Sequence, residues 1–425
     1  MFCAVTSSPV ELVNERNNMY ELLQGLRIVE HASFIAAPSC GLYLRQLGAE
    51  VIRIDLIQGG PDQGRWPLSP EGSNFYWEGL NKGKKSIAID MSCHEGRELA
   101  AEIITASGKY GGVFVTNSPP DGFLSHAQLT ARRADLISVR IMGWGSGLTA
   151  VDYTVNAALG LPYMTGPAET GSMPVNHVLP AWDLMAGMYA ACALLVAERR
   201  RSSTGLGQEI RIPLGDIAAS TLGNLGQVAE VTVGADRERI GNDLFGAFGR
   251  DFVMRDGSRI MLVAITQRQW TSLIAALDLK DRIAELEDEL NVCFEKDEGL
   301  RFTHRNRLFP IVEAAVREGE VEDILSSLAE HNVCWSHYRT LKQALTEDAV
   351  FSEGYGLFAP VAHPSGRCYP TPGAPGTVSD TARQMPSCAP RLGEHTDEIL
   401  AGVIGLSDFQ IGRLHDMKIV VGPVS

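Results

Sequence analysis

Asp183 is the carboxylate whose position in this sequence best suits a chemical role. It follows Pro180-Ala181-Trp182 and opens a long apolar stretch, Leu184 to Arg201, that is typical of a buried helix. An aspartate in this place is commonly the N-cap of its helix. A carboxylate at a helix N-terminus also stays ionised, and an ionised carboxylate is a usable nucleophile. The cap and the nucleophile are therefore compatible interpretations.

The densest cationic segment is Asn81-Lys82-Gly83-Lys84-Lys85-Ser86, which precedes a predicted strand. It does not match the Walker A pattern, so it is not a P-loop of that kind. Two interpretations remain open. The segment is either a solvated turn or a loop whose lysines bind the phosphates of an anionic ligand.

Other catalytic patterns are weak or missing in the sequence. Gly-x-Ser-x-Gly does not occur, which disfavours an α/β-hydrolase. His31 lies in the first predicted strand-to-helix turn and fits either a site or a packed core histidine. His177 precedes Asp183 too loosely to indicate a pair. The ten histidines and eight cysteines show neither HExxH nor CxxC spacing, so we expect no metal site and reduced, scattered thiols.

The elements that must position these residues belong to a globular chain of 425 residues, 45% apolar and 21% charged. This length predicts two or three domains. The formal net charge of −14 disfavours broad binding of nucleic acid or anionic membranes, although it leaves room for a small basic pocket. The sequence has no uninterrupted apolar run of about 18 residues and no apolar N-terminal leader. We therefore expect a cytoplasmic protein that does not span a membrane.

Short apolar runs alternate with helical patterns over the N-terminal half, which is typical of a parallel sheet with helices on both faces. We expect an α/β fold with a Rossmann-like large domain. The predicted strands are 26–30, 51–55, 86–90, 112–116, 136–141 and 209–213, and the predicted helices are 38–47, 95–106 and 181–201.

The turn after the first predicted strand is where a Rossmann protein would bind a dinucleotide. It reads Glu30-His31-Ala32-Ser33-Phe34-Ile35-Ala36-Ala37-Pro38 and contains no glycine. The dinucleotide fingerprint needs glycines there so that the backbone can approach a pyrophosphate. Asp55 ends the second strand, as a ribose-binding acid would, but carries little weight without them. NAD and FAD are therefore disfavoured.

The pattern changes after about residue 230. Alternation around Asp256-Gly257 predicts a hairpin over 252–266. Residues 360–390 are rich in proline and glycine and predict an extended return linker. Predicted helices are 268–277, 280–290, 305–317, 321–330, 340–347, 394–403 and 407–415, the last with Ser407 as its N-cap. We expect a flexible arm over 1–20, a large domain over 21–230 and 360–425, and a small α+β domain over 231–359.

Several segments, in their order and spacing, resemble the class III CoA-transferases, the family that includes formyl-CoA transferase and α-methylacyl-CoA racemase. Each segment is weakly specific alone, but together they run from Gly25 to the C-terminal helices. The segments are GLRIVE (25–30), AAP (36–38), GAEVIRID (48–55), GGPD (59–62), RW (65–66), LNKGKKSIAID (80–90), the helix of Asp183, TGLGQEI (204–210) and PRLGEHTDEIL (390–400).

The resemblance implies a large Rossmann-like domain with a smaller domain inserted, and two subunits that interlock as a homodimer. It implies that Asp183 is the nucleophile, that CoA lies along the C-terminal ends of the strands, and that no cofactor is needed beyond the CoA moiety of the substrate. Relatives often carry basic residues where this chain has Ser92 and Ser125, which shifts the phosphate contacts to other basic residues. The implied CoA contacts are Phe34, Ala36, Lys84, Ile89, Asn117 and Arg140.

Within the family, segments such as YWEGLNKGKKS (76–86) and VNHVLPAWD (175–183) are most similar to members that move CoA between the two carboxyl groups of mesaconate. Intermolecular CoA transfer between organic acids is the alternative. Racemisation is disfavoured, because racemase relatives carry a histidine where this chain has Val151, which cannot transfer a proton. The intact Asp183 disfavours a protein that binds CoA without turnover.

A substrate with a second carboxylate needs a cationic or donor-rich subsite. Arg65, His177 and Arg250 are the candidates. Bulky apolar residues around the pocket would exclude water from an anhydride or thioester intermediate. The candidates for these walls are Phe34, Trp66, Phe245 and Phe248, with Trp182 beside the nucleophile.

Overall fold

The computed structural model describes residues 20–119, 121–234, 236–379, 381 and 383–423. The expected arm over 1–20 lies outside the described residues except for Tyr20, which is buried and donates a hydrogen bond to the Gly376 carbonyl. The chain divides into two compact units, which are described separately. Unit 1 holds the described residues up to Val155, Leu179–Leu225 and the residues from Asp348 onwards, and unit 2 holds Asn156–Val178 and Gly226–Glu347.

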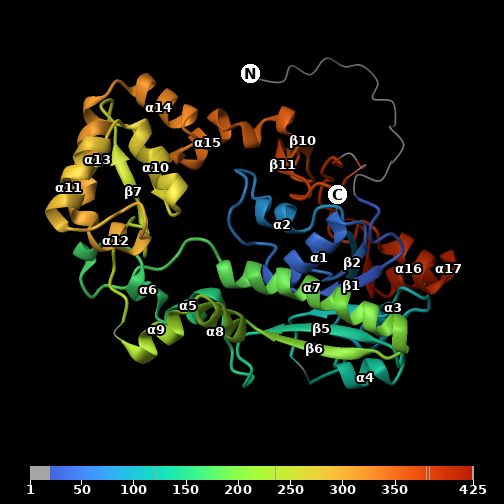
Figure 1. Cartoon of the computed structure of the whole chain (residues 1–425). Coiled ribbons are helices and arrows are strands. Elements are labelled where there is room, and N and C mark those ends of the chain that lie inside the picture. Colours follow the sequence, from blue (N-terminus) through green and yellow to red (C-terminus); the bar gives the residue numbers. More distant parts are fainter. Residues whose placement is uncertain (1–19, 120, 235, 380, 382, 424–425) are drawn as a thin grey trace, which may run out of the picture. The chain divides into compact units, whose positions relative to one another are not determined.

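Unit 1 is built on a seven-stranded sheet in the order β12-β3-β2-β1-β4-β5-β6 (Figure 1). All neighbouring pairs are parallel except β12 with β3. The expected α/β class is confirmed: the sheet is parallel-dominated and carries helices. Its strands are β1 (Arg27–His31), β2 (Glu50–Leu56), β3 (Lys85–Ile89), β4 (Val113–Thr116), β5 (Ile137–Met142), β6 (Gln208–Pro213) and β12 (Val420–Val421).

Alternation along the strands divides the side chains between the two faces of the sheet. One face is apolar and packs against α3, α4, α16 and α17 around residues such as Ile54, Ile87 and Phe114. The other face, which α1, α7 and α8 cover, carries buried polar residues such as Glu30 and Arg53. The helices of unit 1 are α1 (Ala36–Gln46), α2 (Phe75–Leu80), α3 (His94–Thr105), α4 (His126–Thr130), α7 (Ala181–Thr204), α8 (Leu214–Asn224), α16 (Thr396–Ile404) and α17 (Asp408–Asp416). Helix α5 (Asp152–Ala158) begins in unit 1 and continues into unit 2 after Val155.

Helix α7 packs along α1, and a glycine makes the close approach possible (Figure 1). A Cβ atom on Gly187 would lie 2.1 Å from Ser39 Oγ and 2.6 Å from the Ala36 carbonyl oxygen. Among the described residues, α7 is one helix that is long and apolar enough to cross a membrane. Core helices of soluble proteins also meet this criterion of length and composition.

The expectation that α7 is buried all round is wrong for one of its faces. Its small residues pack against α1 and the sheet, whereas larger apolar side chains on the opposite face are exposed. These are Met185, Met188, Tyr189 and Val196, which recur at helical spacing and form a stripe. We refer to them below as the α7 stripe.

The segment expected to be an extended return linker contains a hairpin. Strands β10 (Phe358–Ala362) and β11 (Cys368–Pro372) pair antiparallel, with Pro360 opposite Pro370. The turn joining them packs on α2 of the same unit, because the Glu78 carboxylate accepts hydrogen bonds from the Ser365 amide and hydroxyl and from the Tyr369 hydroxyl. Proline-rich composition concealed this pairing.

Unit 2 is a three-stranded antiparallel sheet packed with helices. Strands β7 (Phe248–Val253), β8 (Arg259–Ala264) and β9 (Cys334–His337) pair in that order, and the predicted hairpin at Asp256-Gly257 joins the first two. The helices are α6 (Leu161–Met164), α9 (Gln227–Val233), α10 (Gln267–Ala276), α11 (Lys280–Leu290), α12 (Glu298–Thr303), α13 (Arg305–Glu318), α14 (Val321–Glu330) and α15 (Leu341–Glu347).

The segment Asn156–Val178 groups with unit 2, whereas its position in the sequence placed it in the expected large domain. Hydrogen bonds within unit 2 account for this. Arg239 donates to the carbonyl of Tyr163, and the Gly241 amide donates to the carbonyl of Gly166.

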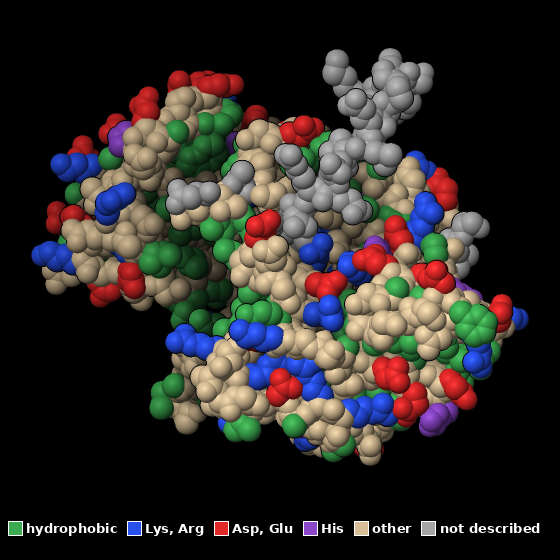
Figure 2. Space-filling model, turned by 90° about the vertical axis from the view of Figure 1, so that its right-hand side faces the viewer, with side chains coloured by type: hydrophobic (Ala, Val, Ile, Leu, Met, Phe, Trp, Pro, Cys, Tyr) green, Lys and Arg blue, Asp and Glu red, His purple; other side chains and the backbone are tan. Residues whose placement is uncertain are grey.

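Acidic and basic side chains are intermixed over the face of the molecule that Figure 2 draws. The net charge of −14 therefore does not form a single acidic surface on that face.

Candidate active site

A pocket of about 720 Å³ opens in unit 1 at the C-terminal ends of the central strands. It is lined by the segments that follow β1, β4 and β5 and by the start of α7. Strand order reverses between β1 and β4, and ligands of doubly wound sheets bind in the crevice outside the strand ends at such a point. Six of the predicted site residues line it: Phe34, Ala36, Arg65, Asn117, Arg140 and Asp183.

A buried ionic network holds in place the turn that follows β1 and the loop that follows β2. Arg53, on β2, donates to Asp55 at 2.7 Å and to Glu30 and Asp62 at 3.1 Å. A buried cation is tolerated only when it is paired in this way. Asp62 in turn accepts the backbone N–H of Phe34 at 3.2 Å, so the network reaches the wall of the pocket.

Phe34 has a backbone φ of 70°, in the left-handed region that non-glycine residues rarely adopt. Such strain persists only where the surroundings hold it, and here Asp62 and Asn117 do so. The Asn117 side chain bridges the two loops at the switch point, since its amide nitrogen donates to the Ser33 carbonyl and its oxygen accepts the Ser33 N–H. The Phe34 ring is thereby presented at the pocket surface.

Asp183 is not the N-cap of α7, contrary to the expectation. Pro180 occupies that position and Asp183 is the third residue of the helix, where its carboxylate lines the pocket. A residue remote in sequence satisfies the first N–H groups: Asp152 Oδ2 accepts from the amides of Trp182 at 2.7 Å and Asp183 at 3.2 Å. The helix end therefore has its cap, but Asp152 supplies it.

The surroundings of Asp183 favour its protonated form, so the expectation that its place at a helix start keeps it fully ionised is also wrong. Burial raises the pKa of Asp183 to about 7, the Asp152 carboxylate adds to this rise, and the Arg65 guanidinium opposes it. Near neutral pH the ionised fraction is substantial. A carboxylate this basic, facing a pocket, can act as a nucleophile.

Arg65 and Tyr76 are polar residues of the pocket that interact electrostatically with Asp183. The Arg65 guanidinium lies 5.3 Å from the ring centre of Tyr76 and 5.7 Å from that of Phe34, both within the range of cation–π attraction. Burial raises the pKa of Tyr76 to about 12, so its hydroxyl is a neutral donor at pH 7. Sequence reasoning missed Tyr76, and its one signal was its place within the YWEGLNKGKKS segment.

Arg140 lines the pocket but is largely engaged in holding the neighbouring loop. Its Nη1 donates to the carbonyls of Ser118 and Pro119, and its Nε lies 3.5 Å from Glu209. Its Nη2 is buried and has no hydrogen-bond partner among the described residues.

Lys84 and Ile89 do not line this pocket, and their contact with CoA stays a prediction. The Lys84 ammonium is buried beneath α1, pairs with Glu30 at 2.9 Å and donates to the Pro38 carbonyl. Ile89 is fully buried in the apolar core on the other face of the sheet. Alternation along β3 dictates its direction.

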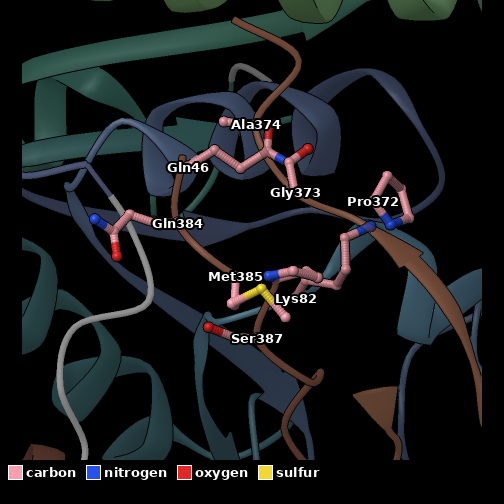
Figure 3. Close-up of a pocket in the computed structure, with 9 residues that line it drawn as sticks. Gln46, Lys82, Pro372, Gly373, Ala374, Gln384, Met385 and Ser387 are labelled. Carbon is pink, nitrogen blue, oxygen red and sulfur yellow. The ribbon is translucent and has the colours of Figure 1, made fainter. Parts of the chain in front are cut away.

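The other lysines of the basic segment are also engaged in structure. Lys85 pairs with Glu50 and Glu398. Lys82 borders a separate cavity of about 20 Å³, where its side chain extends towards Met385 (Figure 3). Burial lowers the pKa of Lys82 to about 8. The burial of Lys82 and Lys84 contradicts the solvated turn, whereas phosphate binding by the segment stays a prediction.

Several predicted residues belong to unit 2, outside the unit that carries the pocket. His177 and Arg250 are among them, and Arg250 lies 3.5 Å from Asp243 and beside the Phe309 ring. Phe248 is buried in the core of unit 2, so its expected role as a pocket wall is wrong. Phe245 packs against Phe302 in the same unit.

Within unit 1, Trp66 is 78% exposed, and neither it nor the buried Trp182 lines the pocket. Phe34 remains as an aromatic wall. The further apolar lining comes from residues that sequence reasoning did not select: Ile141, Met142, Leu148, Val151, Tyr153 and Leu214.

His31 and Asp55 have structural roles. The His31 ring nitrogen Nδ1 lies 3.0 Å from the Ile54 carbonyl oxygen, and Asp55 is buried between Arg53 and Ser86. Asp55 is therefore not placed to bind a ribose. Among the described residues, no group of three or more His, Cys, Asp and Glu side chains is arranged to hold a metal ion.

The sequence and the fold match those of known proteins. The chain belongs to CoA-transferase family III, whose family model matches residues 23–396, and it is an enzyme of that family. It is 46% identical over 407 residues to the 2-methylfumaryl-CoA isomerase of Chloroflexus aurantiacus, with 95% of this chain and 99% of the relative covered.

More distant relatives match at least 90% of the chain. The β subunit of succinyl-CoA–L-malate CoA-transferase from the same organism is 25% identical, with 94% of this chain and 98% of the relative covered. The crystal structure of a CAIB/BAIF family protein from Brucella suis superimposes with a TM-score of 0.72 at 25% identity, covering 90% of this chain and 99% of that one.

Proposed function

We propose that this enzyme moves CoA between the two carboxyl groups of mesaconate and so converts 2-methylfumaryl-CoA to 3-methylfumaryl-CoA. The observation that carries the proposal is a basic, pocket-facing Asp183 in a chain that is 46% identical to an isomerase of this substrate. The reaction needs no cofactor beyond the CoA moiety of the substrate.

The first half of the reaction loads CoA onto the enzyme. The Asp183 carboxylate attacks the thioester carbonyl, the C–S bond breaks, and CoA leaves as a thiolate from a mixed anhydride. The thiolate then attacks the Asp183 carbonyl of the anhydride. This step releases mesaconate as a carboxylate and leaves CoA as an aspartyl thioester.

The second half reverses these steps at the other end of the acid. The second carboxylate of mesaconate attacks the aspartyl thioester and expels the thiolate, which attacks the mesaconyl carbonyl of the new anhydride and restores Asp183. Mesaconate must turn round between the halves. The apolar lining formed by residues such as Ile141, Leu148 and Leu214 excludes water from the intermediates and keeps the acid at high effective concentration.

The pocket offers donors for both parts of the substrate. Arg65 supports the second carboxylate, because it is a cation beside Asp183 that is not committed to a buried network. Arg140 and the Asn117 side chain support CoA at the strand ends. His177 and Arg250 remain candidates for the substrate, and Phe34 and Ala36 for CoA.

Racemisation has less support. The position that carries a histidine in racemase relatives is Val151, which lines the pocket, and the residues lining this pocket include no histidine. Intermolecular transfer between organic acids remains the second candidate. The name of the relative succinyl-CoA–L-malate CoA-transferase describes transfer between two different acids.

The test is isomerisation of 2-methylfumaryl-CoA in the presence of isotopically labelled free mesaconate. Intramolecular transfer predicts many turnovers with little label in the CoA ester pool. Label that enters as fast as isomerisation would make the enzyme an intermolecular transferase. Failure to isomerise the substrate at all would refute the proposal.

A further inference from the structure

Helices α7 and α8 begin in the same way but are capped differently. Each follows a proline at the N-cap position and carries an aspartate as its third residue, Asp183 in α7 and Asp216 in α8, and neither has a side-chain cap of its own. In α8 the Gly215 amide donates to a neutral backbone carbonyl, that of Gly143, at 3.0 Å. A neutral acceptor is therefore sufficient at such a helix start.

In α7 the acceptor is charged and buried. Asp152 is 1% exposed, and its Oδ2 receives both the Trp182 and Asp183 amides. Both aspartates line the same pocket. Placing a second carboxylate beside Asp183 costs electrostatic energy that a neutral acceptor would avoid.

The geometry points to a positioning role for Asp152 in the function proposed above: its carboxylate fixes the first turn of α7 so that Asp183 faces the pocket, and its charge repels the charge on Asp183. The repulsion ends when Asp183 becomes an anhydride or thioester, because the negative charge then leaves on the CoA thiolate or the released carboxylate. Asp152 therefore favours acylation of Asp183.

Three groups from different elements act on Asp183. Asp152 from α5 raises its pKa, Arg65 from the segment between β2 and α2 lowers it, and Tyr76 from α2 is neutral at the pH of the reaction. Where α1 packs along α7, it meets Gly187 with Ser39 and a backbone carbonyl, which carry no charge. Of the two charged groups that shift the pKa of Asp183 among the described residues, removing the Asp152 charge leaves the Arg65 guanidinium.

Asp152→Asn is the informative variant, because an asparagine oxygen can still accept the two amides while the charge is lost. We expect its rate to fall about threefold above pH 8, and the acid limb of kcat/KM to move about one pH unit lower. Asp216→Asn, the matched change in α8, should alter neither. An Asp152→Asn enzyme with the parent's rate and acid limb would overturn the inference.

Asp152→Ala removes the cap as well as the charge. We expect kcat to be lower in Asp152→Ala than in Asp152→Asn, because only the asparagine can still accept the two amides. Equal kcat in the alanine variant and the parent would refute the positioning role.

A measurement without substrate separates this inference from the proposed reaction. ¹³C-labelled aspartate gives a titration curve for Asp183, assigned by its absence in Asp183→Asn. Asp152→Asn should lower the midpoint by about one pH unit. An unchanged midpoint refutes the role of Asp152 even if the enzyme isomerises its substrate, whereas a shifted midpoint without isomerisation refutes the reaction alone.

Discussion

A carboxylate that attacks a thioester is useful only while it is ionised, and the pKa of Asp183 lies at about 7. We therefore expect kcat/KM to fall about tenfold for each pH unit below 7 and to level off above it. Initial rates between pH 5 and 9 measure this. A rate that stays level down to pH 5 would show that Asp183 is ionised throughout, or that it is not the nucleophile.

Asp183→Asn should abolish activity and at the same time stabilise the protein. The raised pKa means that the folded state holds a proton which the unfolded state loses near pH 4, so stability is lost as the pH rises from about 4 to 7. An asparagine avoids this loss. We expect the variant to gain up to about 4 kcal/mol in the free energy of unfolding at pH 8 and almost nothing at pH 3.5.

Urea unfolding at both pH values measures the difference. Asp216→Asn is the control, since it makes the same change at the same position of α8. Freshly purified Asp183→Asn must be used so that deamidation does not restore the aspartate. A variant with full activity would contradict the nucleophile assignment, and equal stability of variant and parent at pH 8 would contradict the raised pKa.

Because α7 lies so close to α1, replacing Gly187 by alanine should change the free energy of unfolding in the opposite direction to the same replacement at Gly402. Gly187→Ala places a methyl group where Ser39 Oγ and the Ala36 carbonyl lie, so we expect a loss of roughly 2 kcal/mol or more in the free energy of unfolding. Gly402→Ala in α16 meets no atom within 4 Å, and we expect a gain of about 0.5–1 kcal/mol from helix propensity. Thermal or urea unfolding of both variants provides the measurement. Similar stabilities for the two would contradict this packing.

The sequence allowed the strands β1 to β6 and most long helices to be predicted, because buried parallel strands appear as short apolar runs and surface helices as amphipathic periods. It did not reveal β10 and β11, whose prolines suit an edge hairpin as well as a linker. Asp183 could be selected as a candidate because the long apolar helix that it opens is a single continuous stretch of the sequence.

The partners of the site residues were not predictable in the same way. Asp152 caps a helix that begins far along the chain, and Arg53 gathers carboxylates from three separate segments. The pairing of Lys84 with the buried Glu30 was not predicted, because a run of lysines gives no sign of which ammonium turns inward. Each of these contacts joins segments that are distant in sequence. They could not be predicted because they depend on which strands become neighbours in the sheet.

At the scale of the whole molecule, the α7 stripe suggests where a second subunit binds. Exposed apolar side chains at helical spacing are typical of an interface, and we propose that the enzyme is a homodimer that buries this stripe. We expect Tyr189→Glu combined with Val196→Glu to shift the parent dimer towards monomer in size-exclusion chromatography with light scattering. Phe409→Glu in α17, a change at a residue that is 77% exposed, is the control. A monomeric parent would refute the dimer.

The hydrogen bond from Trp182 to Asp152 also joins the two ends of a long detour of the chain. The two residues are 30 positions apart, and Asn156–Val178 runs between them. The entropy of closing such a loop grows only with the logarithm of its length, by about 0.6 kcal/mol for each doubling. Insertions, deletions and substitutions in the detour therefore cost little in the free energy of closing it with the hydrogen bond between Trp182 and Asp152.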